Sequence, residues 1–463
     1  MIPQRRAVWK TTQFRQQCGK CDNSPISNSA GSNPIGSATN ETNPIGSNPA
    51  GSNPIEDPHQ IAHTIHPVQM HPAQMAAAGK HSARLWYLPS LEVKICKNAK
   101  VSSPFTPASD SFHCRAMLFR SRSPLRLGLA GGGTDVSPYC DNFGGCVLNV
   151  TIDLHAHCTI EPRSDGIVRF RAADRNECFE APAAPMFDAD ISKPLALHKA
   201  VHNRVAREFP ALAGPSHLAC NVTTYSDAPA GSGLGTSSTL TVAMLGAYKE
   251  WLKLPLGEYE LARTAYEIER FELGLAGGRQ DQYASAFGGV NFMEFSAGER
   301  VIVNPLRIHA DVLNELQACV LLYHNGTSRE SAKIIAEQIG NVQCGSMDSI
   351  EAMHELKRDA VAMKEQLLRG NIPAMARVLA RSWESKKRMA SSISNTDIDA
   401  VMEAALAAGA SAGKVSGAGG GGYIFFMIDP LQREEVSRAL SVFPGWVQPC
   451  QFSLTGVQTW TTR

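Results

Sequence analysis

The strongest constraint on the fold is a change in composition near residue 117. Residues 23–58 hold 24 Asn, Ser, Pro and Gly among 36 positions, and the triplet Asn-Pro-Ile recurs at Asn33, Asn43 and Asn53. Such a segment offers too little apolar surface to offset the entropy lost on ordering. We therefore expect residues 1–116 to form a disordered low-complexity head, and the folded part to begin at Met117.

The composition of the whole chain excludes several function classes. Its 44 Lys+Arg balance 43 Asp+Glu, which does not favour a broad nucleic-acid-binding surface. No run of about 18 apolar residues indicates a membrane helix, and no apolar segment follows the N-terminal Arg5-Arg6 as in a secretory signal. The 12 Cys lack a disulfide-framework spacing. We expect a cytoplasmic protein whose partners are small molecules, not nucleic acid or membrane, and the oligomeric state stays open.

The folded part mixes strands and helices irregularly, which is typical of an α+β fold with two domains, here 117–310 and 311–463. Alternating and periodic apolar residues support this reading. The predicted strands are Cys146–Ile152, His157–Glu161, Val168–Arg171, Gly422–Ile428 and Gln451–Thr455. The predicted helices are Leu240–Leu252, Glu258–Phe271, Ser331–Ile339, Ser349–Leu368, Ile372–Ser385 and Asp397–Ala408.

A glycine-rich loop between Asp227 and Thr239 carries the clearest chemical signal. Glycines alternate at 231, 233 and 235, and the hydroxyl residues that follow open a predicted helix. Glycine lets backbone N–H groups close around an anion, and a helix N-terminus adds free donors and a positive dipole end. The loop predicts a phosphate cradle.

Two common nucleotide-binding motifs are excluded. The loop is not a Walker loop, because no Gly-Lys pair in the chain precedes Ser or Thr. Gly417–Gly422 matches a dinucleotide fingerprint but precedes an apparent strand, not a helix.

Three ordered motifs resemble those of the GHMP kinases, the superfamily of galactokinase, homoserine kinase, mevalonate kinase and phosphomevalonate kinase. They are Pro124–Asp135, Pro229–Ser238 and Lys414–Gly422. The resemblance implies a ribosomal S5-like N-terminal domain, a ferredoxin-like C-terminal domain, and ATP and Mg²⁺ as cofactors. It also implies an ATP-binding loop formed by Pro229, Gly231, Ser232, Gly233, Leu234, Gly235, Thr236, Ser237 and Ser238.

Site roles follow from chemistry together with this resemblance. Phosphoryl transfer needs a metal, a phosphate clamp and a group that receives or orients the hydroxyl proton. Asp281 matches the family's catalytic base, although an Asp there could instead cap a helix. Arg126 matches the motif-one cation that supports the base and the transferring group. Ser237 and Glu269 match the magnesium ligands, with Glu267 and Glu272 as alternatives to Glu269.

The acceptor sugar is assigned to the first and third motifs and to Arg329, which lies just ahead of a predicted helix. The expected contacts are Thr134, Asp135, Gly417, Ala418, Gly419 and Arg329. The sequence Gly-Gly-Gly-Thr-Asp at 131–135 resembles the branch that phosphorylates the anomeric hydroxyl of D-glycero-D-manno-heptose 7-phosphate. An L-fucose or related free-sugar kinase is the alternative within the family. A non-catalytic nucleotide- or sugar-binding regulator is a second alternative, and a retained base argues against it.

Overall fold

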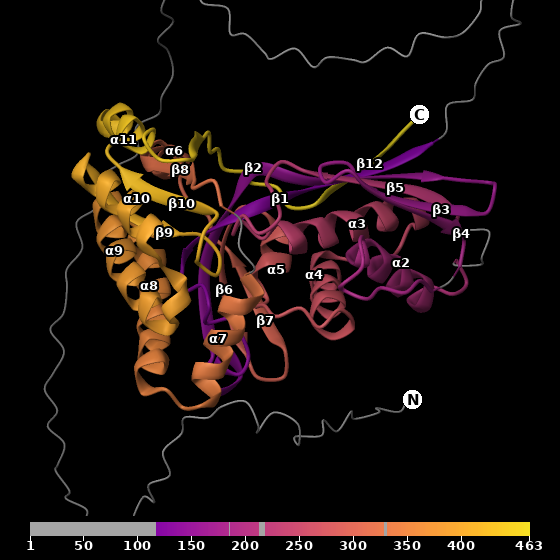
Figure 1. Ribbon diagram of the computed structural model, residues 1–463, viewed down its shortest axis with the longest axis horizontal. Helices are drawn as coiled ribbons and strands as arrows, with labels where there is room; N and C mark the ends of the chain where they lie inside the picture. Colours follow the sequence, from indigo (N-terminus) through magenta and orange to yellow (C-terminus); the bar gives the residue numbers. More distant parts are fainter. Residues whose placement is uncertain (1–116, 185, 213–217, 328–330) are drawn as a thin grey trace, which may run out of the picture. The chain divides into compact units, whose positions relative to one another are not determined.

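The computed structural model describes residues 117–463 except 185, 213–217 and 328–330. These residues belong to one unit, Phe112–Arg463, and the elements are labelled as in Figure 1. The predicted disordered head, residues 1–116, lies outside the described residues, and so does Arg329.

An eight-stranded sheet organises the first part of the described chain. Its path is β12-β1-β2-β5-β3-β4, and β6 pairs with both β2 and β7. Every pairing is antiparallel except that of β3 with β5. The strands are β1 (Leu118–Ala130), β2 (Gly145–Pro162), β3 (Ile167–Ala172), β4 (Glu177–Pro182), β5 (Cys220–Ser226), β6 (Val290–Ser296), β7 (Arg300–Pro305) and β12 (Gln458–Thr462).

Helices α2 to α5 gather below strands β3, β5 and β12 of this sheet in the view of Figure 1. Helix α3 is buried along most of its length, as expected for a helix enclosed between a sheet and other helices. The helices of this part are α1 (Tyr139–Phe143), α2 (Ala196–Glu208), α3 (Thr236–Leu252), α4 (Glu258–Glu267) and α5 (Gln280–Phe287), with a π-helix, η1 (Ile268–Glu272), after α4.

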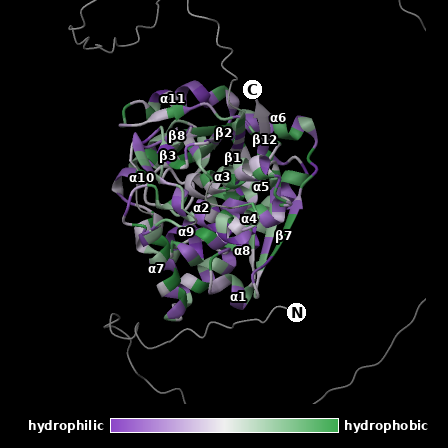
Figure 2. Ribbon diagram, turned by 90° about the vertical axis from the view of Figure 1, so that its right-hand side faces the viewer, coloured by the Kyte–Doolittle hydropathy of each residue, from purple (hydrophilic) through white to green (hydrophobic). Residues whose placement is uncertain are grey.

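A second, four-stranded antiparallel sheet follows, in the order β11-β8-β10-β9. Its strands are β8 (Val320–His324), β9 (Ala410–Val415), β10 (Tyr423–Ile428) and β11 (Trp446–Gln448). The helices around it are α6 (Ala310–Cys319), α7 (Ser331–Gln343), α8 (Met347–Leu368), α9 (Ile372–Met389), α10 (Thr396–Ala407) and α11 (Arg433–Leu440), with 3₁₀ turns η2 (Ser391–Ile393) and η3 (Pro430–Gln432). Figure 2 shows hydrophobic and hydrophilic residues on the same helices, as expected for elements with one buried face.

The structure confirms the α+β prediction and corrects some of its elements. The two strands predicted within 146–161 form one strand, β2. The helix predicted to Phe271 ends as an α-helix at Glu267 and continues as η1. The predicted strand Gln451–Thr455 is wrong. Among these residues only Phe452 forms a bridge, and the C-terminal strand is β12, which pairs with β1.

The pairing of β12 with β1 means that the end of the chain returns to the first sheet. The proposed division at residue 310 therefore stays a prediction. In the described part of the chain, no helix combines the length and apolar character needed to span a membrane.

Candidate active site

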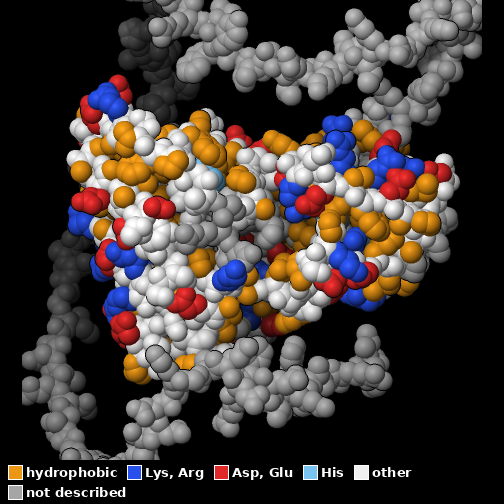
Figure 3. Space-filling model, viewed as in Figure 1, with side chains coloured by type: hydrophobic (Ala, Val, Ile, Leu, Met, Phe, Trp, Pro, Cys, Tyr) orange, Lys and Arg blue, Asp and Glu red, His pale blue; other side chains and the backbone are white. Residues whose placement is uncertain are grey.

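A cavity of about 370 Å³ lies where the three glycine-rich motifs meet. A hollow is visible near the centre of the face drawn in Figure 3. Helices α5, α7 and α9, the π-helix η1 and residues 275–278 also contribute to its walls. The lining includes Arg126, Gly132, Gly133, Asp135, Gly231, Ser232, Gly233, Gly235, Thr236, Ser237, Ser238, Arg270, Gln280, Asp281, Gln338, Lys386, Gly417 and Ala418.

The predicted phosphate loop forms one side of the cavity and leads directly into α3. Gly231, Gly233 and Gly235 have φ of +76°, +81° and +81°, a region that side chains rarely adopt. A Cβ on Gly233 would lie 2.5 Å from the backbone oxygen of Ser416, and one on Gly235 would lie 3.1 Å from Cγ of Asp281. Gly233 and Gly235 are therefore required by close packing on the third motif and on α5, apart from any phosphate.

Two predicted loop residues serve the fold and do not line the cavity. Leu234 is fully buried, and its carbonyl accepts a hydrogen bond from the backbone N–H of Arg126 (3.1 Å). The carbonyl of Pro229 accepts a hydrogen bond from the hydroxyl of Thr236 (3.3 Å). The remaining predicted loop residues all face the cavity.

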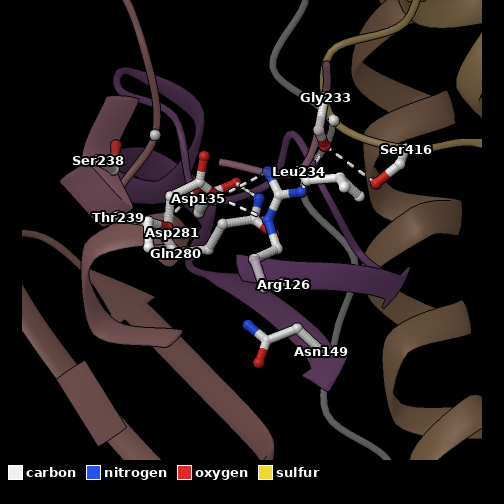
Figure 4. Close-up of polar contacts among 12 residues, drawn as sticks. Arg126, Asp135, Asn149, Gly233, Leu234, Ser238, Thr239, Gln280, Asp281 and Ser416 are labelled. Carbon is white, nitrogen blue, oxygen red and sulfur yellow. Dashed lines mark hydrogen bonds and ion pairs between the residues drawn. The ribbon is translucent and has the colours of Figure 1, made fainter. Parts of the chain in front are cut away.

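Arg126 connects the phosphate loop to Asp281 (Figure 4). Its Nε and Nη2 both lie 2.7 Å from Oδ1 of Asp281, and its Nη1 donates to the carbonyl of Gly233 at 2.6 Å. The Arg126 side chain is 4% exposed and that of Asp281 is 23% exposed. No described residue donates a hydrogen bond to Oδ2 of Asp281, which lies beside Gly235. One carboxylate oxygen is thus held in place and the other faces the cavity.

Asp135 lines the cavity, but its oxygens are already engaged by protein donors. Oδ2 accepts hydrogen bonds from the backbone N–H groups of Arg279 (2.9 Å) and Gln280 (3.0 Å). Oδ1 accepts them from the Gln280 side chain (2.9 Å) and the backbone of Gly133 (3.2 Å). Four donors match the lone pairs of a carboxylate. A sugar hydroxyl would have to replace one of them, so the geometry favours a loop-organising role.

Thr134 does not line the cavity and is fully buried. Its hydroxyl lies within donor distance of the carbonyls of Gly131 (2.8 Å) and Cys146 (3.0 Å), and it accepts from the backbone N–H of Cys146 (3.1 Å). The structure therefore does not bring this predicted substrate residue to the site.

Glu269 lies behind the first turn of α3 and is fully buried. Ser237 and Ser238 donate to its two carboxylate oxygens at 3.0 and 2.7 Å. The side chain of Gln282 donates to Glu269 and also to Ser238 (2.9 Å). The predicted pair Ser237 and Glu269 is thus brought together. By contrast, Glu267 and Glu272 both form ion pairs with Arg204, away from the cavity.

The first turn of α5 holds three parts of the site at once. Gln280, Asp281 and Gln282 are consecutive, and their side chains reach Asp135, Arg126 and Glu269 respectively. Sequence reasoning identified only Asp281. The two glutamines gave no separate signal, because their role depends on partners more than ten residues away.

The third motif packs against the phosphate loop. The Ser416 hydroxyl donates to the carbonyl of Gly233 (3.0 Å), and Gly417 and Ala418 line the cavity. Gly419 does not line it. A Cβ there would lie 2.8 Å from the carbonyl of Ile393. Arg329 is outside the described residues, so the structure does not place it.

Four further polar residues face the cavity and were not predicted from the sequence: Arg270, Ser331, Gln338 and Lys386. Lys386 lies beyond the predicted end of its helix at Ser385, because α9 continues to Met389. His155 and His157 lie near Asp153 and Asp227 and do not line the cavity.

Comparisons with known proteins give the same assignment as the motifs. Residues 196–289 match the model of the GHMP kinases N terminal domain, and residues 363–444 match that of the GHMP kinases C terminal. The chain is 46% identical over 341 residues to a D-glycero-alpha-D-manno-heptose 7-phosphate kinase from Campylobacter jejuni, covering 74% of this chain and 98% of that protein.

A solved structure and a second relative, both named as sugar kinases, are also similar to this chain. The crystal structure of a D-glycero-D-manno-heptose 1-phosphate kinase from Bacteroides thetaiotaomicron is 44% identical, with a TM-score of 0.63, over 74% of this chain and 98% of that one. An L-fucokinase/L-fucose-1-P guanylyltransferase from Bacteroides fragilis is 29% identical over 69% of this chain but only 36% of its own length. These findings confirm the predicted two-domain architecture, and the chain belongs to the GHMP kinase family.

Proposed function

We propose that this protein transfers the terminal phosphoryl group of ATP to the anomeric hydroxyl of D-glycero-D-manno-heptose 7-phosphate, giving the 1,7-bisphosphate. The support is the 46% identity to a heptose 7-phosphate kinase along nearly that protein's full length. The crystal structure that is 44% identical is named a heptose 1-phosphate kinase. The two names place the phosphate of the substrate on different carbons, C7 and C1. The carbon that receives the new phosphate is therefore the point to test.

The observation that carries the proposal is the orientation of Asp281 beside the phosphate loop. A sugar hydroxyl is a poor nucleophile until its proton has an acceptor within hydrogen-bond reach. Arg126 fixes Oδ1 of Asp281 and leaves Oδ2 toward the cavity, where an acceptor hydroxyl can approach. The guanidinium of Arg126 lies between Asp281 and the phosphate loop, where it can stabilise the negative charge that develops on the transferring group.

The nucleotide side of the cavity is the N-terminus of α3 with its glycine loop. Free backbone N–H groups at a helix start and the positive end of the helix dipole favour phosphate. Ser416 and Arg126 both hold the carbonyl of Gly233, which keeps this carbonyl away from the phosphates. We propose that residues 231–238 bind the ATP phosphates.

The donor set near this loop fits a magnesium ion. Ser237 and Glu269 offer hard oxygen ligands 3.0 Å apart, and Mg²⁺ commonly uses few protein ligands together with nucleotide phosphates and waters. Within the described part of the chain, the hydrogen-bond partners of Glu269 are the neutral Ser237, Ser238 and Gln282. We propose that Ser237 and Glu269 hold Mg²⁺, which when bound supplies positive charge to the phosphates.

The test is a coupled ADP-release assay over a panel of acceptors. The panel comprises heptose 7-phosphate, heptose 1-phosphate, unphosphorylated heptose, L-fucose, galactose and mevalonate, each with ATP and Mg²⁺. We expect the highest kcat/KM for heptose 7-phosphate. A higher value for L-fucose would favour the free-sugar alternative, and no turnover of any acceptor would favour a binding-only regulator. Cytoplasmic location stays a prediction.

A further inference from the structure

Lys386 is a buried cation that faces the candidate active site. It lies in the last turn of α9, is 1% exposed, and lines the cavity. Its ammonium donates to the carbonyl of Gly417 and, at 3.4 Å, to that of Val415, both in the third motif. An ammonium has three N–H donors. Two carbonyl contacts therefore leave one donor for a ligand.

Lys386 forms no ion pair with an acidic side chain in the described part of the chain. Burial lowers its pKa well below the usual value, and the positive charges of Lys414 and Arg126 lower it further. Asp135 acts in the opposite direction, but four N–H donors occupy its oxygens. No carboxylate among the described residues forms an ion pair with Lys386. An anionic ligand in the cavity would supply the missing counter-ion and would favour the charged form of Lys386, which burial disfavours.

Lys386 lies between the segment assigned to the acceptor and the phosphate loop. One turn further along α9, the Met389 side chain comes within 2.6 Å of where a Cβ on Gly133 would lie. On the other side, Gly417, whose carbonyl Lys386 holds, packs on Gly233. A Cβ on Gly417 would lie 2.7 Å from Cα of Gly233. A phosphate bound on either side would be near this ammonium.

We propose that Lys386 binds a phosphate oxygen in the cavity. Two phosphates have the same chemistry: the one that the acceptor sugar already carries, and the terminal phosphate of the nucleotide. The proposal rests on the proposed function for the identity of the acceptor.

The test compares Lys386→Met with Lys387→Met. The neighbouring Lys387 does not line the cavity and forms an ion pair with Glu384 (2.9 Å), so its substitution is the matched control. KM and kcat are measured for ATP, heptose 7-phosphate and unphosphorylated heptose.

The expected size of the effect follows from the strength of the lost contact. A hydrogen bond to a charged group changes affinity by roughly 10- to 100-fold. If Lys386 holds the sugar phosphate, KM for heptose 7-phosphate rises by that factor and its advantage over heptose disappears. If it holds the nucleotide, KM for ATP rises and the two sugars keep their ratio.

Two outcomes would overturn the proposal. One is a folded Lys386→Met variant whose constants stay within about twofold of the control. The other is an equal loss for every ligand with a lowered Tm, which indicates only a structural role. Should the Met variant not fold, Lys386→Gln keeps N–H donors for the two carbonyls without the charge and gives the same readouts. A parent protein inactive on every heptose phosphate refutes the proposed function instead, and calorimetric titration with ATP then decides the role of Lys386.

Discussion

Replacing Asp281 by Asn keeps the shape of the side chain at the centre of the site but removes its ability to accept a proton. In the parent protein, Oδ1 accepts from both Nε and Nη2 of Arg126 at 2.7 Å. Because a guanidinium has only donors, the new amide must turn its oxygen toward Arg126. Its NH₂ group then takes the position of Oδ2, beside Gly235 and toward the cavity.

This orientation determines the size of the effect. The variant cannot accept the hydroxyl proton, and it presents N–H donors where an acceptor is needed. Loss of a general base typically costs about 10²–10⁴-fold, and we expect kcat to fall by that factor while KM for ATP changes little. We also expect a lowered Tm, because the buried Arg126 (4% exposed) loses its counter-ion, although the amide oxygen still accepts hydrogen bonds from it.

The assay is steady-state kinetics on heptose 7-phosphate, with Tm measured in parallel. Asp141→Asn is the matched control, since Asp141 faces Arg279 at 3.4 Å outside the cavity and its loss should leave kcat within about twofold. Arg126→Ala should weaken the same step, and the double variant should lose less than the product of the single losses. Near-normal kcat in a folded Asp281→Asn variant would refute the reasoning. The base would then lie elsewhere, or positioning and electrostatics alone would carry the transfer.

Three other changes test separate parts of the site. Gly233→Val should abolish turnover or raise KM for ATP, because its Cβ would lie 2.5 Å from the carbonyl of Ser416; unchanged ATP affinity in a folded variant would remove this loop from the site. Gln282→Leu removes an N–H donor from buried Glu269 and should raise the Mg²⁺ concentration needed for half-maximal rate by roughly 10-fold, with the thermal melt as control. Burial lowers the pKa of Lys414 to about 8, so its charge destabilises the fold fully below pH 8 and progressively less up to about pH 10.5. Lys414→Met should therefore be more stable than the parent near pH 7, by an amount on the order of 3 kcal/mol that shrinks above pH 8 in denaturant titrations; a pH-independent difference would contradict the sign.

Local patterns predicted helices α3, α4 and α7 to α10, and segments of strands β2, β3 and β10, but neither the other strands nor pairings between distant segments. The periodicity of α8 and α10 is local, and their predicted ranges agree with the structure within two residues. Strand β12 pairs with β1 across more than 300 residues, which no local pattern encodes. The prediction divided β2 into two strands around Asp153 and Leu154. These two residues are less buried than those before them, and the register of β2 with β1 shifts at this point.

In the candidate active site, too, residues in sequence motifs were predicted, and residues whose roles depend on distant contacts were not. Asp281, Arg126 and the glycine loop were predictable because motifs place them in sequence, and the structure brings them together. Gln282 and Lys386 were missed because their roles come from burial beside Glu269 and Gly417. The π-helix η1 that carries Glu269 has no distinct sequence signature, although it places this carboxylate under α3.

The most direct test of the proposed function is the position of the new phosphate. Purified protein is incubated with ATP, Mg²⁺ and D-glycero-D-manno-heptose 7-phosphate, and the product is followed by ³¹P and ¹H NMR. We predict a second phosphate signal coupled to the anomeric proton, formed in step with ADP and absent with Asp281→Asn on the same time scale. A phosphate on any other carbon, or ADP release without a phosphorylated sugar, would contradict the assignment.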